Sequence, residues 1–185
     1  MRIIGGQRRG KILLSPPDDS IRPTSDRARE SLFNILLHRF FPGGLEAMHW
    51  LDLFCGTGAV ACEALSRGVL AATLIDENEG ALQIARKNVE ACGFSSAATF
   101  RRVDALAFIN HGDLTPYGII FADPPYQTTK AQQALDAVAA STFTGIFILE
   151  TDAKLALTAP EGTECLLLRR YGKGQLSFWQ KANKA

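Results

Sequence analysis

The chain is organised around residues 50–60, Trp-Leu-Asp-Leu-Phe-Cys-Gly-Thr-Gly-Ala-Val. The apolar first half predicts a buried strand, which Asp52 interrupts, and Gly56-Thr57-Gly58 then turns the chain into an alanine-rich helix. Glycine lets a ligand approach the backbone without interference from a Cβ atom. The start of a helix also carries amides that have no partner inside the helix. The stretch therefore predicts a strand, a loop and a helix that suit a cofactor with a polar or negative end.

The rest of the chain alternates between apolar runs and helical periodicity, which is typical of a parallel sheet covered by helices. After the opening strand we expect strands at about 71–75, 98–103, 117–122, 145–149, 165–169 and 175–179, and helices at 59–67, 79–92 and 130–140. The predicted fold class is α/β with a Rossmann-like sheet.

The 185 residues provide enough chain for one sizeable core, and 46% hydrophobic with 21% charged residues is ordinary globular composition. The sequence has no long apolar run and no cysteine or histidine spacing that indicates a metal site or a disulfide framework. We expect a soluble cytoplasmic protein that is monomeric, with reduced cysteines, no bound metal and no association with a membrane.

Four successive strands are expected to carry an aspartate at or near their carboxyl ends: Asp52, Asp76, Asp104 and Asp123. In an open parallel sheet ligands bind outside these ends of the strands, so the four carboxylates should meet in one pocket. The alternative is that Asp52 and Asp104 only cap helices or turns.

The glycine spacing also fits a dinucleotide fingerprint, with Asp76 at the right interval for a ribose, so a nicotinamide oxidoreductase is one alternative. Asp52 argues against it, because a carboxylate beside the loop repels a pyrophosphate but suits the ammonium and sulfonium of S-adenosylmethionine. The loop amides and Asp52 would hold the methionine end, Asp76 or Glu77 the ribose, and Asp104 with the Ala105 backbone the adenine. The expected cofactor contacts are Asp52, Phe54, Gly56, Gly58, Asp76, Glu77, Asp104 and Ala105.

Asp123-Pro124-Pro125-Tyr126 follows an apolar strand and predicts a rigid turn, because two prolines cannot continue a sheet. The Asp123 side chain and the Pro124 carbonyl can accept both hydrogens of an exocyclic base amine, which favours the pyramidal nitrogen that attacks a methyl group. Tyr126 can stack on the base. The alternative is an ordinary proline turn with a surface tyrosine.

The first 40 residues hold eight Lys or Arg against four Asp or Glu. They predict a hairpin with a basic tip, followed by a helix that Thr24 or Ser25 caps and that Pro42-Gly43-Gly44 ends. Cations at a helix start oppose its dipole, so we expect them to serve binding rather than helix stability. The expected substrate contacts are Arg8, Arg9, Lys11, Arg22, Thr24, Arg27, Arg29 and Pro125. The alternative is a solvated surface on which arginines pair with nearby acids.

These motifs resemble a known family. Asp52-x-Phe54-x-Gly56-x-Gly58 with Asp123-Pro124-Pro125-Tyr126 resembles class I S-adenosylmethionine-dependent methyltransferases that act on exocyclic amines. The closer resemblance is to the RsmD-type 16S ribosomal RNA guanine-N2 methyltransferases. It rests on Met1-Arg2-Ile3-Ile4-Gly5-Gly6, Arg22-Pro23-Thr24-x-Asp26-Arg27-x-Arg29-Glu30, Glu63-Ala64-Leu65-Ser66-Arg67-Gly68 and Arg170-Tyr171-Gly172.

The resemblance implies a seven-stranded, mostly parallel sheet with an antiparallel last strand. It also implies a guanine N2 acceptor in the 16S rRNA of a partly or fully assembled small ribosomal subunit. Residues 1–46 would form an RNA-contacting extension of the methyltransferase domain, residues 47–185, within one compact unit. The departures are Cys55, Val60-Ala61-Cys62, and Asp76 where Glu is common. A DNA adenine-N6 methyltransferase and a non-catalytic cofactor-binding RNA or assembly factor remain as alternatives.

Overall fold

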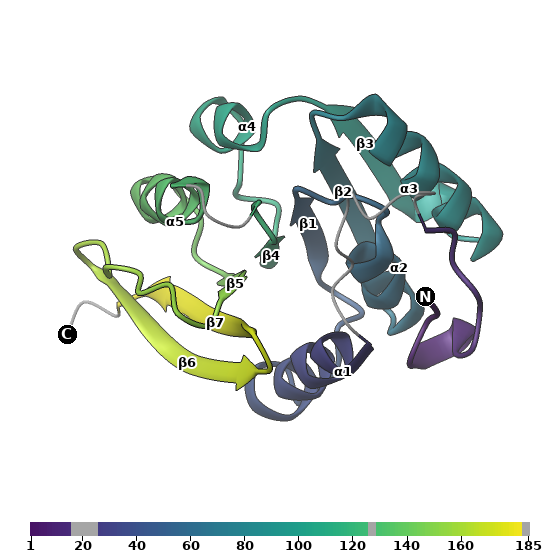
Figure 1. Ribbon diagram of the computed structural model, residues 1–185, viewed down its shortest axis with the longest axis horizontal. Coiled ribbons are helices and arrows are strands. Elements are labelled where there is room, and N and C mark those ends of the chain that lie inside the picture. Colours follow the sequence, from purple (N-terminus) through teal and green to yellow (C-terminus); the bar gives the residue numbers. More distant parts are fainter. Residues whose placement is uncertain (16–25, 126–128, 183–185) are drawn as a thin grey trace.

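A computed structural model describes residues 1–15, 26–125 and 129–182. Its seven strands form one sheet in the order β3-β2-β1-β4-β5-β7-β6 (Figure 1). The strands are β1 (His49–Leu53), β2 (Ala71–Asp76), β3 (Ala98–Arg102), β4 (Ile119–Ala122), β5 (Ile146–Asp152), β6 (Thr163–Tyr171) and β7 (Gly174–Lys181). The first five strands are parallel, and β7 runs antiparallel between β5 and β6. This confirms the predicted Rossmann-like sheet with its antiparallel last strand.

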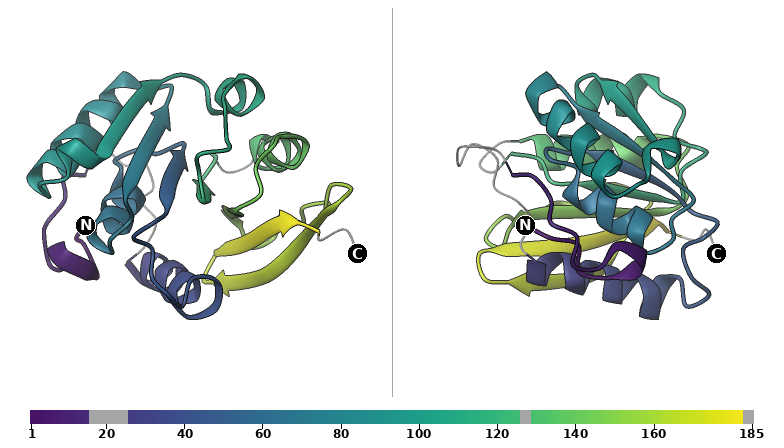
Figure 2. Two further views of the ribbon diagram at one scale, coloured as in Figure 1. Left: turned by 180° about the vertical axis from the view of Figure 1, so that it is seen from behind. Right: turned by 90° about the vertical axis from the view of Figure 1, so that its right-hand side faces the viewer.

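Helices cover both faces of the sheet (Figures 1 and 2). One face carries α1 (Asp26–Ile35), its π-helical continuation η2 (Leu36–Phe40), α2 (Ala59–Ser66) and α3 (Glu79–Ala91); the other carries α4 (Ala105–His111) and α5 (Lys130–Ala140). Two short 3-10 turns, η1 (Gly6–Arg8) and η3 (Ser95–Ala97), complete the described elements.

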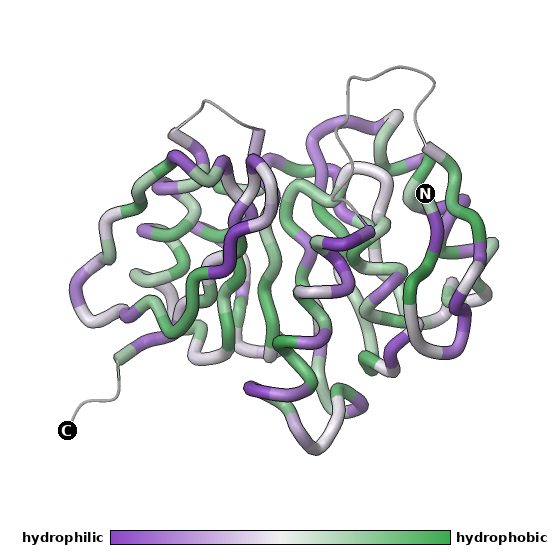
Figure 3. Tube along the Cα trace, turned by 60° about the horizontal axis from the view of Figure 1, so that its bottom comes forward, coloured by the Kyte–Doolittle hydropathy of each residue, from purple (hydrophilic) through white to green (hydrophobic). Residues whose placement is uncertain are grey.

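The sheet separates two apolar cores because side chains alternate along each strand. Trp50 of β1 is fully buried beneath α1, where its ring stacks on Phe33 at 5.5 Å and on Phe121 of β4 at 6.1 Å between centroids. Figure 3 shows the hydrophobic stretches running through the strands in the middle of the molecule. The expected helix of the first 46 residues thus packs into the same core as the sheet.

The helix α4 was not predicted from the sequence. It has only seven residues, and two apolar positions four residues apart, Ala105 and Ile109, form its buried face. Asp104 caps it by accepting a hydrogen bond from the Ala107 amide at 2.9 Å. A helix this short is stabilised by its cap and by packing rather than by its own sequence. Its apolar pattern covers too few residues to be recognised in the sequence.

Residues 1–15, here called the N-terminal segment, form a looser hairpin than expected. An isolated antiparallel bridge joins Arg2 to Ile12, and the amides of Ile3 and Leu13 donate across the hairpin to the carbonyls of Lys11 and Met1. Its turn lies so close to α2 that a Cβ atom on Gly6 would be 1.9 Å from the carbonyl oxygen of Ser66. The expected helix cap at Thr24 or Ser25 lies outside the described residues.

No helix in the described part of the chain is both long and apolar enough to cross a membrane. Within residues 1–15, 26–125 and 129–182, no group of three or more His, Cys, Asp or Glu side chains is arranged to hold a metal ion.

Candidate active site

The loop between β1 and α2 has an unusual backbone. Phe54, Gly56 and Gly58 all have positive φ angles, of 59°, 52° and 71°. A Cβ atom on Gly58 would lie 3.0 Å from atoms of Leu74 and Ala85, so glycine is needed for space as well as for conformation. Phe54 is strained there, since a non-glycine residue in this region is disfavoured by roughly 1–2 kcal/mol. Such strain is concentrated at functional sites, where the surrounding structure holds it in place.

The loop amides are less available to a ligand than the sequence led us to expect. The Gly56 amide donates to Asp76 Oδ2 at 2.9 Å, and the Gly58 amide donates to the Cys55 carbonyl at 2.8 Å. The loop therefore uses these amides to hold its own shape, and a cofactor would meet a surface that is already rigid.

Asp52 lies beneath this loop and not on its surface. It is 1% exposed, and its Oδ2 accepts a hydrogen bond from the Ala61 amide in the first turn of α2 at 3.1 Å. Burial raises the pKa of Asp52 well above its ordinary value; the hydrogen bond from Ala61 lowers it, and the charge of Asp76 raises it further. Asp52 thus binds a backbone amide at the start of α2, which agrees with the interpretation of Asp52 as a cap. The direct cofactor contact expected from the sequence does not fit a side chain that is this deeply buried.

We expect Asp52→Asn to raise the free energy of unfolding at neutral pH. Because the folded-state pKa is raised, stability falls as the pH rises above the ordinary value of 3.8, and the loss is complete above the folded-state pKa. Asparagine keeps an oxygen for the Ala61 amide and carries no charge. The gain should be larger at pH 8 than at pH 4, because the wild-type carboxyl is closer to neutral at pH 4 in both the folded and the unfolded state. Urea denaturation at pH 4 and pH 8 measures it; a variant no more stable than the wild type at pH 8 would contradict this account.

Asp76, the last residue of β2, and Glu77, which follows it, lie in different settings. The carboxylate of Asp76 is held by two backbone amides, that of Gly56 at 2.9 Å and that of Asn78 at 2.8 Å. The Glu77 side chain is 67% exposed and lies 3.5 Å from Lys130 Nζ. Asp76 is therefore the fixed acceptor at this strand end, and it keeps lone pairs for a further donor.

Asp104 and Ala105 stand at the start of α4. One carboxylate oxygen of Asp104 caps the helix, and the other lies 3.7 Å from Lys130 Nζ. Ala105 is buried against the sheet. One oxygen of Asp104 thus caps a helix, as one of the two interpretations of the sequence stated. The other oxygen lies beside the same Lys130 ammonium as Glu77.

Lys130 is a residue of this site that the sequence interpretation missed. Its Nζ atom lies between Glu77 and Asp104 and 5.7 Å from the centroid of the Phe54 ring. It therefore joins the loops that follow β1, β2 and β3. A signal was present, because Lys130 begins a predicted helix, where a cation opposes the helix dipole.

The turn after β4 lies beside the loop after β1. The two strands are neighbours, with Leu53 opposite Ala122, so Phe54 and Asp123 leave the sheet side by side. The strand order reverses between β1 and β4, which is where ligands bind in open α/β sheets. Asp123 is half-buried, Pro124 is buried and Pro125 is exposed, and Tyr126 lies outside the described residues.

The basic residues that we expected to contact the substrate lie in different settings. Arg9, Lys11 and Arg27 are exposed. Arg8 is held by its Nε, which donates to the Cys92 carbonyl at 2.7 Å. Arg29 is fully buried, pairs with Asp26 at 2.6 Å and donates to the Arg2 carbonyl at 2.8 Å. The expected phosphate contact of Arg29 does not fit this position, because its guanidinium fastens α1 to the N-terminal segment. Arg22 and Thr24 lie outside the described residues.

Glu63 explains why the N-terminal motif and the motif at 63–68 occur together. Its buried carboxylate accepts from the amides of Ile4 at 2.7 Å and Gly5 at 2.8 Å, and from Arg67 Nε at 2.8 Å. Ser66 Oγ donates to the Gly5 carbonyl and accepts from the Arg8 amide. The sequence signal was an acid within a largely apolar helix, although its backbone partners are nearly 60 residues away.

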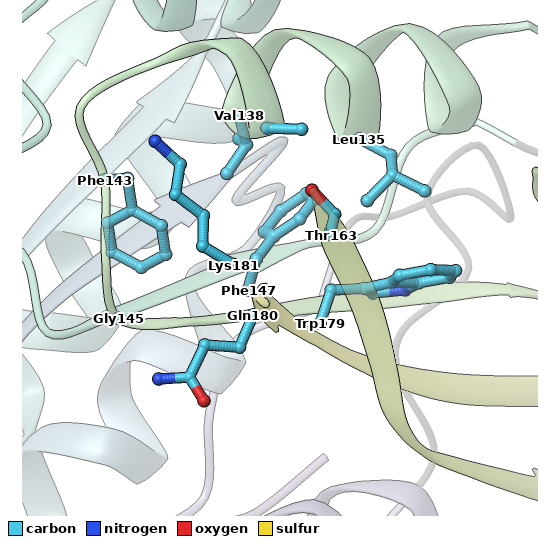
Figure 4. A pocket seen from close by; sticks show the side chains of 10 residues that line it. Leu135, Val138, Phe143, Gly145, Phe147, Thr163, Trp179, Gln180 and Lys181 are labelled. Carbon is cyan, nitrogen blue, oxygen red and sulfur yellow. The ribbon is translucent and has the colours of Figure 1, made fainter. Parts of the chain in front are cut away.

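A hollow between α5 and β7 is not part of this site. It occupies about 240 Å³ including its open mouth, and its lining includes Leu135, Phe147 and Trp179 (Figure 4). It lies at the amino end of β5, whereas Asp123 and the glycine loop lie at the carboxyl ends of the strands.

Comparisons with known proteins agree with the geometry. The model of the family described as conserved hypothetical protein 95 matches residues 1–180. "Putative rRNA methyltransferase YlbH" of Bacillus subtilis is 31% identical over 98% of this chain and 99% of its own length. Ribosomal RNA small subunit methyltransferase D of Escherichia coli is 38% identical over 74% of this chain and 65% of its own length.

Solved structures with methyltransferase titles superpose on this chain. "Putative methyltransferase yhhF" of Escherichia coli superposes with a TM-score of 0.82 at 29% identity, covering 100% of this chain and 99% of that one. An RNA methyltransferase from Salinibacter ruber, solved with S-adenosyl-L-homocysteine, has a TM-score of 0.67 at 14% identity, covers 89% of this chain and 96% of its own, and shares the fold. The chain belongs to the conserved hypothetical protein 95 family, the RsmD-type methyltransferases.

Proposed function

We propose that this protein transfers the methyl group of S-adenosylmethionine to the exocyclic N2 amine of a guanine in the 16S rRNA of a small ribosomal subunit. The observation that carries the proposal is the meeting of two loops at the strand-order reversal. The strained Phe54 loop follows β1, and the Asp123-Pro124-Pro125 turn follows β4 at the neighbouring position. The names of two relatives, both rRNA methyltransferases, support the RNA substrate.

The residues at the site fit this cofactor. The Phe54 ring lies 5.7 Å from the Lys130 ammonium, whose charge Glu77 and Asp104 balance at 3.5 and 3.7 Å. Asp76 offers a fixed carboxylate for two ribose hydroxyls, and Asp104 with the Ala105 backbone offers polar groups for an adenine. When bound, the cofactor supplies an electrophilic methyl group on a positively charged sulfur.

Asp123 and Pro124 would present the acceptor amine. The lone pair of a guanine N2 amine is delocalised into the ring, which makes it a weak nucleophile. When the Asp123 carboxylate and the Pro124 carbonyl each accept one of its hydrogens, the nitrogen is oriented toward the methyl group. Tyr126 would stack on the base and Pro125 would contact it. After transfer the nitrogen loses a proton, which Asp123 would accept.

The base must reach this turn unpaired or flipped out of its helix, because a duplex hides the amine. We propose that residues 1–46 hold the surrounding RNA, with Arg9, Lys11 and Arg27 as the exposed phosphate contacts.

We expect Arg9→Glu combined with Lys11→Glu to weaken RNA binding without changing cofactor affinity. Each lost phosphate contact should reduce the slope of log affinity against log salt by about 1. Filter binding of small-subunit RNA from 50 to 300 mM salt measures the slope. An unchanged slope would show that the N-terminal segment does not contact RNA.

The proposed reaction is tested directly by supplying labelled S-adenosylmethionine with unmethylated small-subunit particles, with naked rRNA and with DNA. Mass spectrometry of the digested product identifies the methylated base. N2-methylguanine from the particles or from the rRNA supports the proposal. N6-methyladenine from DNA would favour a DNA methyltransferase instead, and cofactor binding without methylation would favour a non-catalytic assembly factor.

A further inference from the structure

We propose that Asn88 is a positioning residue that joins the cofactor loop to the N-terminal segment, so that a ligand bound to the loop also holds that segment in place. The inference rests on the proposed function, because that function assigns the cofactor to the loop after β1 and RNA to the N-terminal segment. Asn88 lies in α3 and is fully buried.

The contacts of Asn88 reach two distant parts of the backbone. Its Oδ1 accepts from the Leu14 amide at 2.7 Å, and its Nδ2 donates to the Leu14 carbonyl at 3.1 Å and to the Thr57 carbonyl at 2.9 Å. Since an amide oxygen only accepts and an amide nitrogen only donates, these three bonds fix the orientation of the side chain. One side chain therefore holds the middle residue of the glycine loop and the end of the N-terminal hairpin.

The position of Asn88 in α3 argues for this bridging role. Asparagine is a poor helix former, and a buried amide is unfavourable unless it is fully bonded. Its helix neighbours on the buried face, Ala85 and Val89, are apolar. An apolar residue would serve the helix and its packing better, so the long-range bonds are what the asparagine provides.

The bond to Thr57 matters for the shape of the loop. It fixes the plane of the Thr57–Gly58 peptide, whose amide donates to the Cys55 carbonyl at 2.8 Å. A ligand that binds the loop stabilises the conformation in which the loop is formed. It therefore reduces the population of locally unfolded states in which the Asn88 hydrogen bonds are broken. By linkage, the same ligand stabilises the Leu14 end of the N-terminal segment, which follows the exposed residues Arg9 and Lys11.

Amide hydrogen exchange with and without S-adenosylhomocysteine tests the coupling in the full-length protein. At a ligand concentration one hundred times Kd, the amides of Leu13 and Leu14 should exchange more slowly in the wild type, by up to about a hundredfold if they open together with the loop. In Asn88→Ala they should exchange faster and should no longer respond to the ligand.

Two further variants separate coupling from a general loss of stability. Asn88→Asp keeps an oxygen for the Leu14 amide but turns a second oxygen toward two carbonyls, so it should also lose the response. Asn110→Asp makes the same chemical change at an exposed position of α4, and in this variant the amides of Leu13 and Leu14 should still respond to the ligand. The amide of Leu51 in the buried strand β1 reports global unfolding in each variant.

The outcomes are distinguishable. If the wild type does not bind S-adenosylhomocysteine, the proposed function fails and the inference with it. If the wild type binds it but Leu13 and Leu14 exchange at unchanged rates, only the coupling is overturned. A ligand response of Leu13 and Leu14 in Asn88→Ala that exceeds the response of Leu51 overturns the coupling as well.

Discussion

Replacement of Asp123 by alanine is expected to lower the rate of methyl transfer by about a thousandfold while S-adenosylmethionine still binds with nearly the same affinity. The removed carboxylate would no longer orient the base amine, and losing one such electrostatic contact lowers rates by about 10²–10³. Losing a proton acceptor as well places the expected effect at the upper end of that range. Single-turnover methylation of small-subunit particles measures the rate, and calorimetry measures cofactor affinity.

Asp123→Asn is the matched control for this substitution. Asparagine retains one oxygen that can accept from the amine but cannot take a proton. Substantial activity in this variant would show that hydrogen bonding is the main role of Asp123, and activity as low as in Asp123→Ala would show that the charge or the proton transfer is required. A large loss of cofactor affinity in either variant would place Asp123 in the cofactor site instead.

Glu63→Ala should lower the free energy of unfolding by about 3–5 kcal/mol, the usual effect of removing one partner from a buried ion pair. The substitution leaves the Arg67 guanidinium, which also lies 5.1 Å from the Phe33 ring, without its carboxylate. It also leaves the amides of Ile4 and Gly5 without their acceptor. Chemical denaturation measures the loss.

Glu63→Gln provides the comparison, because it keeps the volume and one acceptor oxygen while removing the charge. It should be destabilised less than Glu63→Ala. In both variants RNA affinity should fall more than cofactor affinity, since the bonds that are lost hold the N-terminal segment. Equal losses for the two ligands would mean that Glu63 supports the whole fold and not that segment in particular.

Much of the fold was predictable because its signals are local. The apolar run at 51–54, the glycines that follow it and the aspartates at the ends of later strands each depend on a few neighbouring residues. Strand ends in a parallel sheet share one edge, so the placement of Asp76, Asp104 and Asp123 at the same edge of the sheet followed from the element order alone. The antiparallel last strand came from the family resemblance.

The remaining features depend on contacts between residues that are distant in sequence. Nothing near Arg29 distinguishes it from the exposed Arg27, and only the packing of α1 against the N-terminal segment buries it. The same holds for Glu63 and Asn88, whose backbone partners lie 31 to 74 residues away. Asp52 was identified as a site residue, but its burial beneath the loop could not be read from its place in a strand.

The fastening of the N-terminal segment has a consequence for the order in which the chain folds. This segment is synthesised before its hydrogen-bond partners Glu63, Asn88 and Cys92, which come 58 to 84 residues later. Closing such long loops is slow compared with forming local helices. The basic hairpin can therefore reach its final place only after α2 and α3 have formed, and a nascent chain without them would lack the assembled segment that we propose to bind ribosomal RNA.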